Sequence, residues 1–337
     1  MTSTPRQRVG LASLACAALL AGCAPLATQS IATPSSIDAH VERAQQAAGH
    51  DLRNLLRLCE PQPRERATTT AARDENLRKL IARPAPSPTQ VFENFYFVGG
   101  DFVSAWILKT SAGLVLFDAL NNAAEARELI EGGLTKLGLD PREIKYIVVT
   151  HGHGDHYGGA QYLVEKYHPH VVATDADWNM MHGKLEFDSS VWGPAPARDM
   201  SVRDGETLTV GDATITFLVT AGHTLGTLSP MFDVRAGGRV YHAVLWGGTA
   251  FNFGKDFSRF ASYVDNTERL RALAATMPID VLVSNHSEWD DSIAKMNALR
   301  AAGPGTGNPF LTGSRVVQRS MQVMGECARA QAGRFGY

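Results

Sequence analysis

Three histidines and an aspartate fall within residues 151–156, which read His-Gly-His-Gly-Asp-His and directly follow the mostly apolar run 144–150. A short apolar run rich in β-branched residues predicts a buried strand, so the polar cluster occupies the loop where that strand ends. Two further histidines stand in the same relation to a strand, because His223 follows the run 214–220 and His286 follows the run 279–284. A chain with this pattern is expected to bring the ends of three distant strands to one cleft.

Histidine and aspartate at this density are typical of a metal site. His151 and His153 stand two residues apart in a loop, so both imidazoles can turn toward one ion, while Asp155 and His156 can face a second ion beside it. Neutral imidazole with one carboxylate suits Zn²⁺, although iron and manganese are compatible with the same donors. Four ligands are too few for two ions, and the histidines at the two later strand ends are expected to complete the set.

The order of the predicted elements favours sheets packed between helices. Short β-rich runs separated by glycine and turn residues fill residues 91–120, as in a meander of antiparallel strands. Strands and helices then follow in two similar series as far as residue 302, without a sequence repeat that would indicate a duplication. We expect a helical extension and linker over residues 37–90, the main domain over residues 91–302, and a loop and last helix over residues 303–337.

The N-terminus predicts export from the cytoplasm. Arg6 and Arg8 precede an apolar run that is too short for a membrane span and ends in Leu-Ala-Gly-Cys. This ending resembles the bacterial lipobox, so we expect a signal peptide over residues 1–22, lipidation of Cys23 and a tether over residues 23–36. The alternative is an ordinary cleaved signal with an incidental cysteine. A lipid anchor predicts a periplasmic protein attached to the outer membrane.

Cys59 and Cys327 are the two cysteines that remain after the predicted signal peptide. In an oxidising periplasm they can pair, and a disulfide closing so long a loop would stabilise the fold by about 2–4 kcal/mol. Two unpaired buried thiols are the alternative. Neither cysteine has metal-ligand spacing to another.

The charge of the chain points away from nucleic acid. Its 32 basic residues nearly balance its 34 acidic residues, which gives a formal net charge of −2. Since no overall field would attract a polyanion, we expect a small-molecule substrate and no nucleic-acid partner. Contact with a membrane is expected only through the lipid anchor.

The histidine motifs together resemble the metallo-β-lactamase superfamily. The resemblance is carried by HxHxDH at residues 151–156, Gly-His-Thr-x-Gly at residues 222–226 and Asn-His at residues 285–286. It implies an α/β fold, an αβ/βα four-layer sandwich of two mixed β-sheets flanked by helices, here with an N-terminal helical extension. It also implies two zinc ions per chain, the first held by His151, His153 and His223 and the second by Asp155, His156 and His286. Asp118 matches the family's aspartate under the site, which implies that it orients the loop.

The resemblance also implies a hydrolase. A hydroxide shared by two zinc ions would attack a carbonyl, with Asp155 orienting it, so no protein nucleophile is required. Residues 239–251 lack the aspartate that glyoxalase II enzymes and many lactonases carry between the last two histidine motifs. The chain is therefore most similar to the third subclass of class B β-lactamases, and opening of a β-lactam is the first expectation. A dizinc lactone or ester hydrolase is the alternative, and a nonhydrolytic metal-binding or redox module is the second.

The substrate pocket is less well defined by the sequence. Several enzymes of that subclass carry serines after this strand that seat the substrate carboxylate, whereas residues 245–249 read Leu-Trp-Gly-Gly-Thr. Thr249, Asn252 or Lys255 could take over that role.

Aromatic residues near the loops that carry the motifs could shape the same pocket. Tyr157, next to a predicted ligand, is the first candidate, and Trp246 and Trp192 are among the others. Residues 185–200 are long and irregular enough to form the rim of the pocket.

Overall fold

The computed structural model describes residues 34–65, 68–303 and 306–337. The predicted signal peptide, Cys23 and residues 23–33 of the predicted tether lie outside the described residues. Within the described part of the chain, every helix is too short or too polar to cross a bilayer.

The first sheet has seven strands that lie in the order in which they follow one another along the chain. They are β1 (Thr89–Phe92), β2 (Phe95–Phe97), β3 (Trp106–Thr110), β4 (Gly113–Phe117), β5 (Ile144–Val148), β6 (His170–Ala173) and β7 (Met200–Ser201). The strands β1 to β4 pair antiparallel, as the predicted meander requires, and β4 to β7 pair parallel. The connections contain α3 (Ala123–Glu125), the π-helix η2 (Ala126–Glu131), α4 (Gly132–Lys136), the 3-10 turn η3 (Pro141–Glu143), α5 (Gly154–Tyr157), α6 (Ala160–Tyr167) and α7 (Asp175–His182).

The second sheet has five strands in the order β12-β11-β10-β9-β8. They are β8 (Thr207–Val210), β9 (Ala213–Val219), β10 (Leu228–Ala236), β11 (Arg239–Trp246) and β12 (Val281–Ser284). All neighbours pair antiparallel except β11 and β12, which are parallel because α8 (Phe257–Thr276) connects them. The chain continues with α9 (Ser287–Asp290), α10 (Ser292–Ala301) and α11 (Ser314–Arg334).

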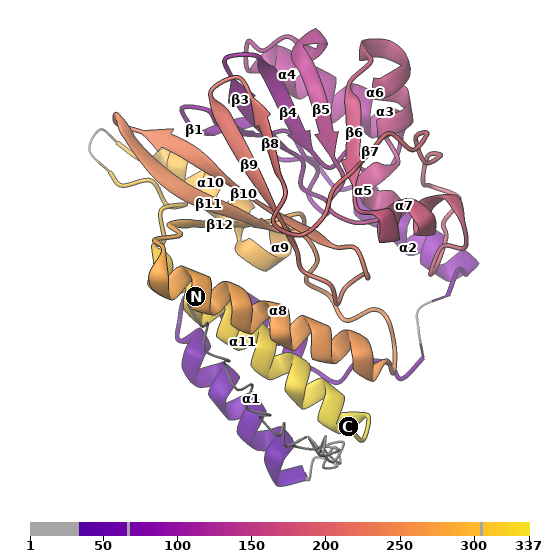
Figure 1. Ribbon diagram of the computed structural model, residues 1–337, viewed down its shortest axis with the longest axis vertical. Helices are drawn as coiled ribbons and strands as arrows, with labels where there is room; N and C mark the ends of the chain where they lie inside the picture. Colours follow the sequence, from indigo (N-terminus) through magenta and orange to yellow (C-terminus); the bar gives the residue numbers. More distant parts are fainter. Residues whose placement is uncertain (1–33, 66–67, 304–305) are drawn as a thin grey trace, which may run out of the picture. The chain divides into compact units, whose positions relative to one another are not determined.

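The two sheets pack face to face and are covered by helices on their outer faces (Figure 1). Between them lies an apolar core in which Phe117 of β4 stacks on Phe232 of β10, with ring centroids 5.0 Å apart. A second cluster fills the space between the first sheet and its helices, and a third, around Tyr263 of α8, covers the second sheet. The protein therefore has the expected αβ/βα sandwich of two mixed sheets.

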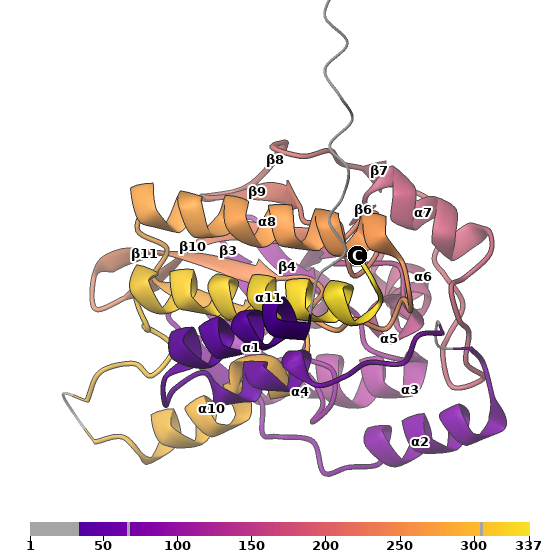
Figure 2. The same cartoon turned by 90° about the horizontal axis from the view of Figure 1, so that it is seen from below.

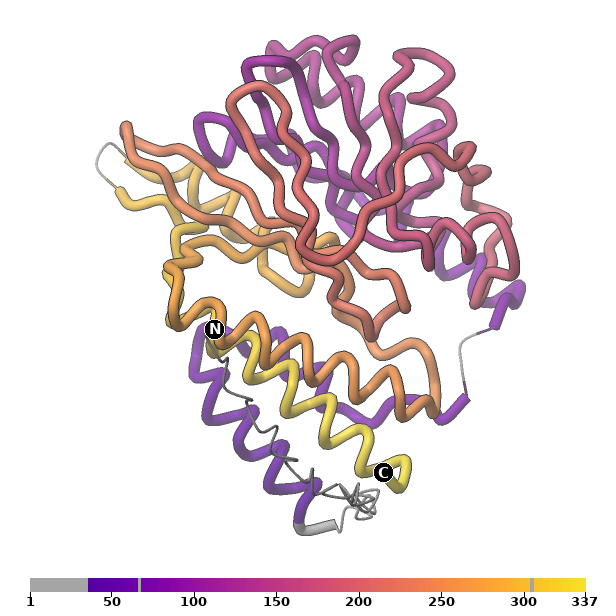
Figure 3. Tube along the Cα trace, in the orientation of Figure 1, coloured from indigo at the N-terminus to yellow at the C-terminus, as the bar shows by residue number. Residues whose placement is uncertain are grey.

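The N-terminal region is helical, as expected, but divides into three pieces: α1 (Pro34–Ala48), the 3-10 helix η1 (Arg53–Cys59) and α2 (Ala71–Ile81). Helix α1 starts within the predicted tether. It lies side by side with α11, which also packs along α8 (Figures 2 and 3). A disulfide joins Cys59 of η1 to Cys327 of α11. The described residues from 34 onward belong to one compact unit, so the N-terminal helices and α11 pack with the sandwich.

Two short strands were missed by the sequence patterns. β6 has four residues and starts at His170, and β7 has two residues and starts at the last residue of the predicted rim segment. Alternation cannot be recognised over so few residues, and these strands exist because β5 provides an edge for parallel pairing.

Candidate metal centre

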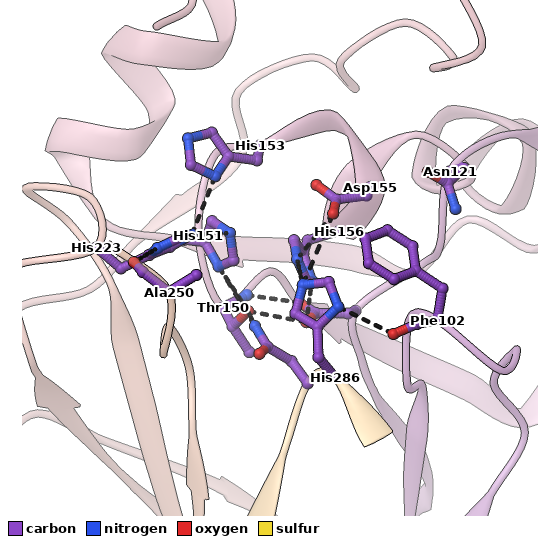
Figure 4. Close-up of polar contacts among 12 residues, drawn as sticks. Phe102, Asn121, Thr150, His151, His153, Asp155, His156, His223, Ala250 and His286 are labelled. Atoms are coloured by element: carbon purple, nitrogen blue, oxygen red, sulfur yellow. Dashed lines mark hydrogen bonds and ion pairs between the residues drawn. The ribbon is translucent and has the colours of Figure 1, made fainter. Parts of the chain in front are cut away.

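Five histidines and one aspartate converge where strands of both sheets end (Figure 4). His151 and His153 lie in the loop after β5, while Asp155 and His156 belong to the single turn of α5. His223 lies between β9 and β10, and His286 comes two residues after the last residue of β12. The structure therefore brings together all six residues that the sequence assigned to the site.

The first group of donors consists of His151, His153 and His223, and all three side chains are buried. Nε2 of His223 lies 3.0 Å from Nε2 of His151 and 3.2 Å from Nδ1 of His153. Three nitrogens at these separations point at one small volume, which suits a single ion.

The second group lies beside the first. Nε2 of His156 is 3.2 Å from Nε2 of His286, and Oδ2 of Asp155 lies 3.6 Å and 3.7 Å from these two nitrogens. The ring centroids of His151 and His156 are 4.0 Å apart, so the two groups are neighbours.

In four of the histidines, the ring nitrogen that faces away from the donor cluster forms a hydrogen bond with an oxygen atom. Nδ1 of each ring lies between 2.7 and 2.9 Å from its acceptor: His151 to the Gly247 carbonyl, His223 to the Ala250 carbonyl, His286 to the Phe102 carbonyl and His156 to Oδ2 of Asp118. Because these oxygens accept hydrogen bonds, each Nδ1 must carry the proton, and a neutral ring then has a bare lone pair on Nε2. Lone pairs that face one another at 3.0–3.2 Å repel unless a cation or a proton lies between them. The donor set therefore fits metal ions, and Zn²⁺ matches its chemistry.

The electrostatics of the rings agree with this fit. Burial lowers the pKa of His151 and His223 well below the ordinary value, and neighbouring imidazoles lower it further. Burial also lowers the pKa of His153 and His286. His156 differs, because the carboxylates of Asp155 and Asp118 outweigh its burial and raise its pKa. Four neutral imidazoles are the form that binds a metal.

Asp118 lies beneath the loop that carries the motif. Its carboxylate accepts hydrogen bonds from the backbone N–H of Thr150 at 2.7 Å and from the Thr150 hydroxyl at 2.8 Å, in addition to the His156 ring. Its backbone has a positive φ of 60°, a conformation in which aspartate is tolerated better than most residues. Asp118 thus fixes both the start of the loop and the orientation of one candidate ligand, His156.

Sequence reasoning missed a buried ion pair behind His153. A carboxylate oxygen of Glu186 lies 3.5 Å from Nε2 of His153, and Nη1 of Arg259 donates to Glu186 at 2.5 Å. Nε of Arg259 donates to the Gly222 carbonyl at 2.7 Å, next to the ligand His223. Although burial raises the pKa of Glu186, the hydrogen bond with His153 and the guanidinium of Arg259 outweigh it and lower the pKa to about 2. The sequence does not indicate this pair, because Glu186 lies in an irregular loop, Arg259 lies in a distant helix, and no motif connects them.

The glycines of Leu-Trp-Gly-Gly-Thr explain why no serine or acid stands there. A Cβ on Gly247 would lie 1.8 Å from the Leu228 carbonyl oxygen, and one on Gly248 would lie 2.6 Å from the Cβ of His223. The close approach lets the Gly247 carbonyl accept hydrogen bonds from both His151 and Asn285.

A pocket opens in front of the histidines, and the predicted substrate residues divide between it and the core. Thr249 and Asn252 line it, as do Phe187 and Trp192 from the predicted rim segment. The remaining walls include Arg73 and Leu77 of α2, Phe102, Glu288 and Trp289.

Three residues proposed for the pocket are absent from its lining. Tyr157 is buried in the cluster between the first sheet and its helices. Trp246 points to the opposite face of the second sheet, where it packs against Tyr263 of α8 with ring centroids 5.9 Å apart. Lys255 lies against the ring of Tyr337. Proximity in sequence to a ligand was misleading, because a helical turn or a strand directs neighbouring side chains to different faces.

A sandwich of two sheets with a histidine-rich donor set at their edge is typical of metal-binding proteins. The comparison with known protein families points to the same class. Residues 98–243 match the family described as the metallo-beta-lactamase superfamily. Over these residues the chain is similar to the metallo-beta-lactamase superfamily.

Curated relatives are named hydroxyacylglutathione hydrolase. The protein of Rhodopseudomonas palustris (strain BisA53) is 31% identical over 149 residues, which cover 44% of this chain and 51% of the relative. That of Ruegeria pomeroyi is 29% identical over 181 residues, which cover 52% of this chain and 60% of the relative. The chain thus spans about half the length of the first of these relatives.

Solved structures of similar fold are metallo-β-lactamases. BJP-1 of Bradyrhizobium japonicum, a subclass B3 metallo-β-lactamase, is 29% identical with a TM-score of 0.60, over 72% of this chain and 92% of that protein. FEZ-1 of Legionella gormanii is 22% identical with a TM-score of 0.63, over 72% of this chain and 94% of that protein, and supports the fold alone.

Proposed function

We propose that this chain is a zinc-dependent hydrolase that opens a cyclic amide, and that β-lactams are its substrates. The observation that carries the proposal is the pair of histidine contacts in which Nε2 atoms of two rings face each other at 3.0 and 3.2 Å. The similarity to BJP-1 over 72% of the chain supports the choice of substrate class.

The six donors would hold two zinc ions in the two groups described above. Zn²⁺ bound there supplies Lewis acidity, which lowers the pKa of water toward neutrality and polarises a carbonyl group. Four of the histidines are oriented for this role, because their Nδ1 atoms are fixed by hydrogen bonds to backbone carbonyls and to Asp118.

The protein's own groups prepare the site for hydrolysis. Burial raises the pKa of Asp155, but the imidazoles of His156 and His286 outweigh it, so the pKa is lowered and the carboxylate stays ionised. Its Oδ2 can accept a hydrogen bond from the attacking water and orient it. The rings of Phe187 and Trp192 on the pocket wall exclude bulk water from the reacting groups.

A dizinc hydrolase of thioesters, lactones or esters is the second candidate, because the curated relatives are named hydroxyacylglutathione hydrolase. The residues of β11 and the following loop argue against it. Residues 239–251 contain no acid that could bridge two metals, and glycine is sterically required at residues 247 and 248.

The two candidates are separated by a substrate panel. The chain without residues 1–22, loaded with zinc, should hydrolyse a chromogenic cephalosporin faster than a γ-lactone or a hydroxyacyl thioester of glutathione. Cleavage of the thioester or lactone with no turnover of any β-lactam would establish the second candidate instead. His153→Ala serves as the control, since loss of a donor should abolish either activity.

We further propose that the protein is exported and anchored in the outer membrane through a lipidated Cys23. The proposal rests on the sequence of residues 1–23, which precede the described residues. Cys23→Ser should move the protein from the membrane fraction to the soluble periplasmic fraction. Unchanged fractionation of this variant would overturn the anchor.

A further inference from the structure

Helix α2 of the N-terminal region forms part of the wall of the candidate active site. Arg73 and Leu77, one turn apart on this helix, line the pocket that also contains His153 and Asp155. Leu77 is buried, whereas Arg73 is partly exposed. A segment outside the domain expected from the sequence thus faces the reacting groups.

The position of α2 is fixed by hydrogen bonds to the loop that carries Phe187. The carboxylate of Asp74 accepts from the hydroxyls of Ser189 at 2.6 Å and Ser190 at 2.5 Å. Just before the helix, the Thr69 hydroxyl donates to the Asp188 carbonyl at 2.6 Å. These contacts set the distance between α2 and the pocket, so Arg73 is held in place by the fold.

The guanidinium of Arg73 is stacked on an aromatic ring at the pocket. Its central carbon lies 4.0 Å from the ring centroid of Phe187, and that ring lies 4.6 Å from the ring of His153. Stacking leaves the edge of the guanidinium, with its N–H donors, available to a planar anion. Burial lowers the pKa of Arg73, and the carboxylate of Asp155 acts in the opposite direction, which is consistent with a guanidinium on the same side of the pocket as the donor groups.

Other arginines near the pocket are already paired. Arg57 contacts Glu288 at 2.9 Å, Arg83 contacts Asp101 at 3.2 Å and Arg259 contacts Glu186 at 2.5 Å. Among the residues that the structure describes, no carboxylate forms an ion pair with Arg73. Nη1 of Arg73 donates to the Thr68 carbonyl at 3.5 Å, so the cation has a backbone partner but no carboxylate that neutralises its charge. A cation in this state at the pocket is suited to a negatively charged ligand.

We propose that Arg73 binds the carboxylate of the substrate and is a specificity-determining residue of the site. The proposal rests on the hydrolase function proposed above. Residues 245–249 lack a group that binds the substrate carboxylate, and Arg73 would supply it. The other candidates are less suitable, because Lys255 is outside the pocket and the side chains of Thr249 and Asn252 carry no charge. A guanidinium can bind a carboxylate through two parallel hydrogen bonds, which also fixes its orientation.

The test compares a cephalosporin with a free carboxylate and its methyl ester on the zinc-loaded chain. Arg73→Ala should raise KM for the acid roughly tenfold or more, with kcat changed only a few-fold, and leave KM for the ester unchanged. Arg73→Lys should recover part of the loss. Lys79→Ala removes an exposed cation from the same helix and should change neither KM. An equal rise of KM for acid and ester, or no rise at all, would overturn the proposal.

A binding measurement keeps the inference separate from the proposed activity. Trp192 and Trp289 line the pocket, so their fluorescence reports binding of hydrolysed cephalosporin to the metal-free chain. Arg73→Gln, which keeps most of the side-chain volume, should bind the product about tenfold more weakly than the unchanged chain. The product esterified at the carboxylate that the intact cephalosporin already carried should show no such loss. If the unchanged chain cleaves neither cephalosporin, the proposed activity fails, and this titration still decides the role of Arg73. Equal binding by both proteins would exclude that role.

Discussion

Nδ1 of His156 lies 2.7 Å from Oδ2 of Asp118, and this contact connects the second donor group to the loop after β4. The same carboxylate holds Thr150, the residue before the first histidine of the motif. Asp118 therefore positions both groups of donors without belonging to either.

Asp118→Ala should lower zinc affinity by roughly 10–100-fold, because the His156 ring loses the acceptor that fixes its proton on Nδ1. The decrease is measured by competition with a chromophoric zinc chelator. Asp118→Asn is the matched control for side-chain volume and should retain the contact with the Thr150 N–H. Zinc affinity that is unchanged in the alanine variant would show that the ring is oriented by other groups.

Glu186→Gln should lower the free energy of unfolding of the metal-free protein by on the order of 3 kcal/mol, since it removes the carboxylate paired with the buried Arg259. Urea denaturation followed by circular dichroism measures the effect. The comparison is Asp140→Asn, which breaks an exposed pair with Arg142 and should change the free energy of unfolding far less. Similar small effects for both variants would contradict the importance of the buried pair.

The disulfide between Cys59 and Cys327 should contribute about 2–5 kcal/mol, because it closes a loop with a sequence separation of 268 residues in the unfolded chain. The double variant Cys59→Ser, Cys327→Ser should therefore unfold at lower urea concentration than the oxidised protein. Addition of a reductant should shift only the protein that contains both cysteines. Coinciding unfolding curves with and without the disulfide would refute this contribution.

Asp177 should make stability depend on pH below neutrality. Its side chain is buried beside the loop of the metal centre, where it accepts a hydrogen bond from the Thr224 hydroxyl at 3.0 Å, and burial raises its pKa to about 7. The unfolded chain ionises this group near pH 4, whereas the folded protein keeps it protonated up to about pH 7. Its effect on stability is therefore most favourable below pH 4, decreases as the pH rises to 7, and is constant above that.

Asp177→Asn should remove this decrease. The free energy of unfolding of the metal-free variant, minus that of the unchanged protein, should grow between pH 4 and pH 7 and then level off. A difference that stays constant over this range would mean that Asp177 ionises normally in the fold.

The convergence of the six candidate ligands could be predicted from the sequence, because each group of them follows an apolar run and the ends of neighbouring strands meet at one edge of a sandwich. His223 and His286, 63 residues apart in number, were found in this way. The role of α2 could not be predicted, since Asp74 contacts Ser189 across 115 residues and neither residue belongs to a periodic pattern. Trp246 was assigned to the wrong face because the direction of a strand's last side chain depends on its register, which a single sequence does not fix.

The most direct test of the account is the zinc content of the purified chain, measured by emission spectrometry together with its hydrolytic rate. We expect two zinc ions per chain, close to one in His286→Ala, and loss of hydrolysis in His153→Ala. A chain that binds no zinc under saturating conditions, or a His153→Ala variant that keeps the full rate, would contradict it.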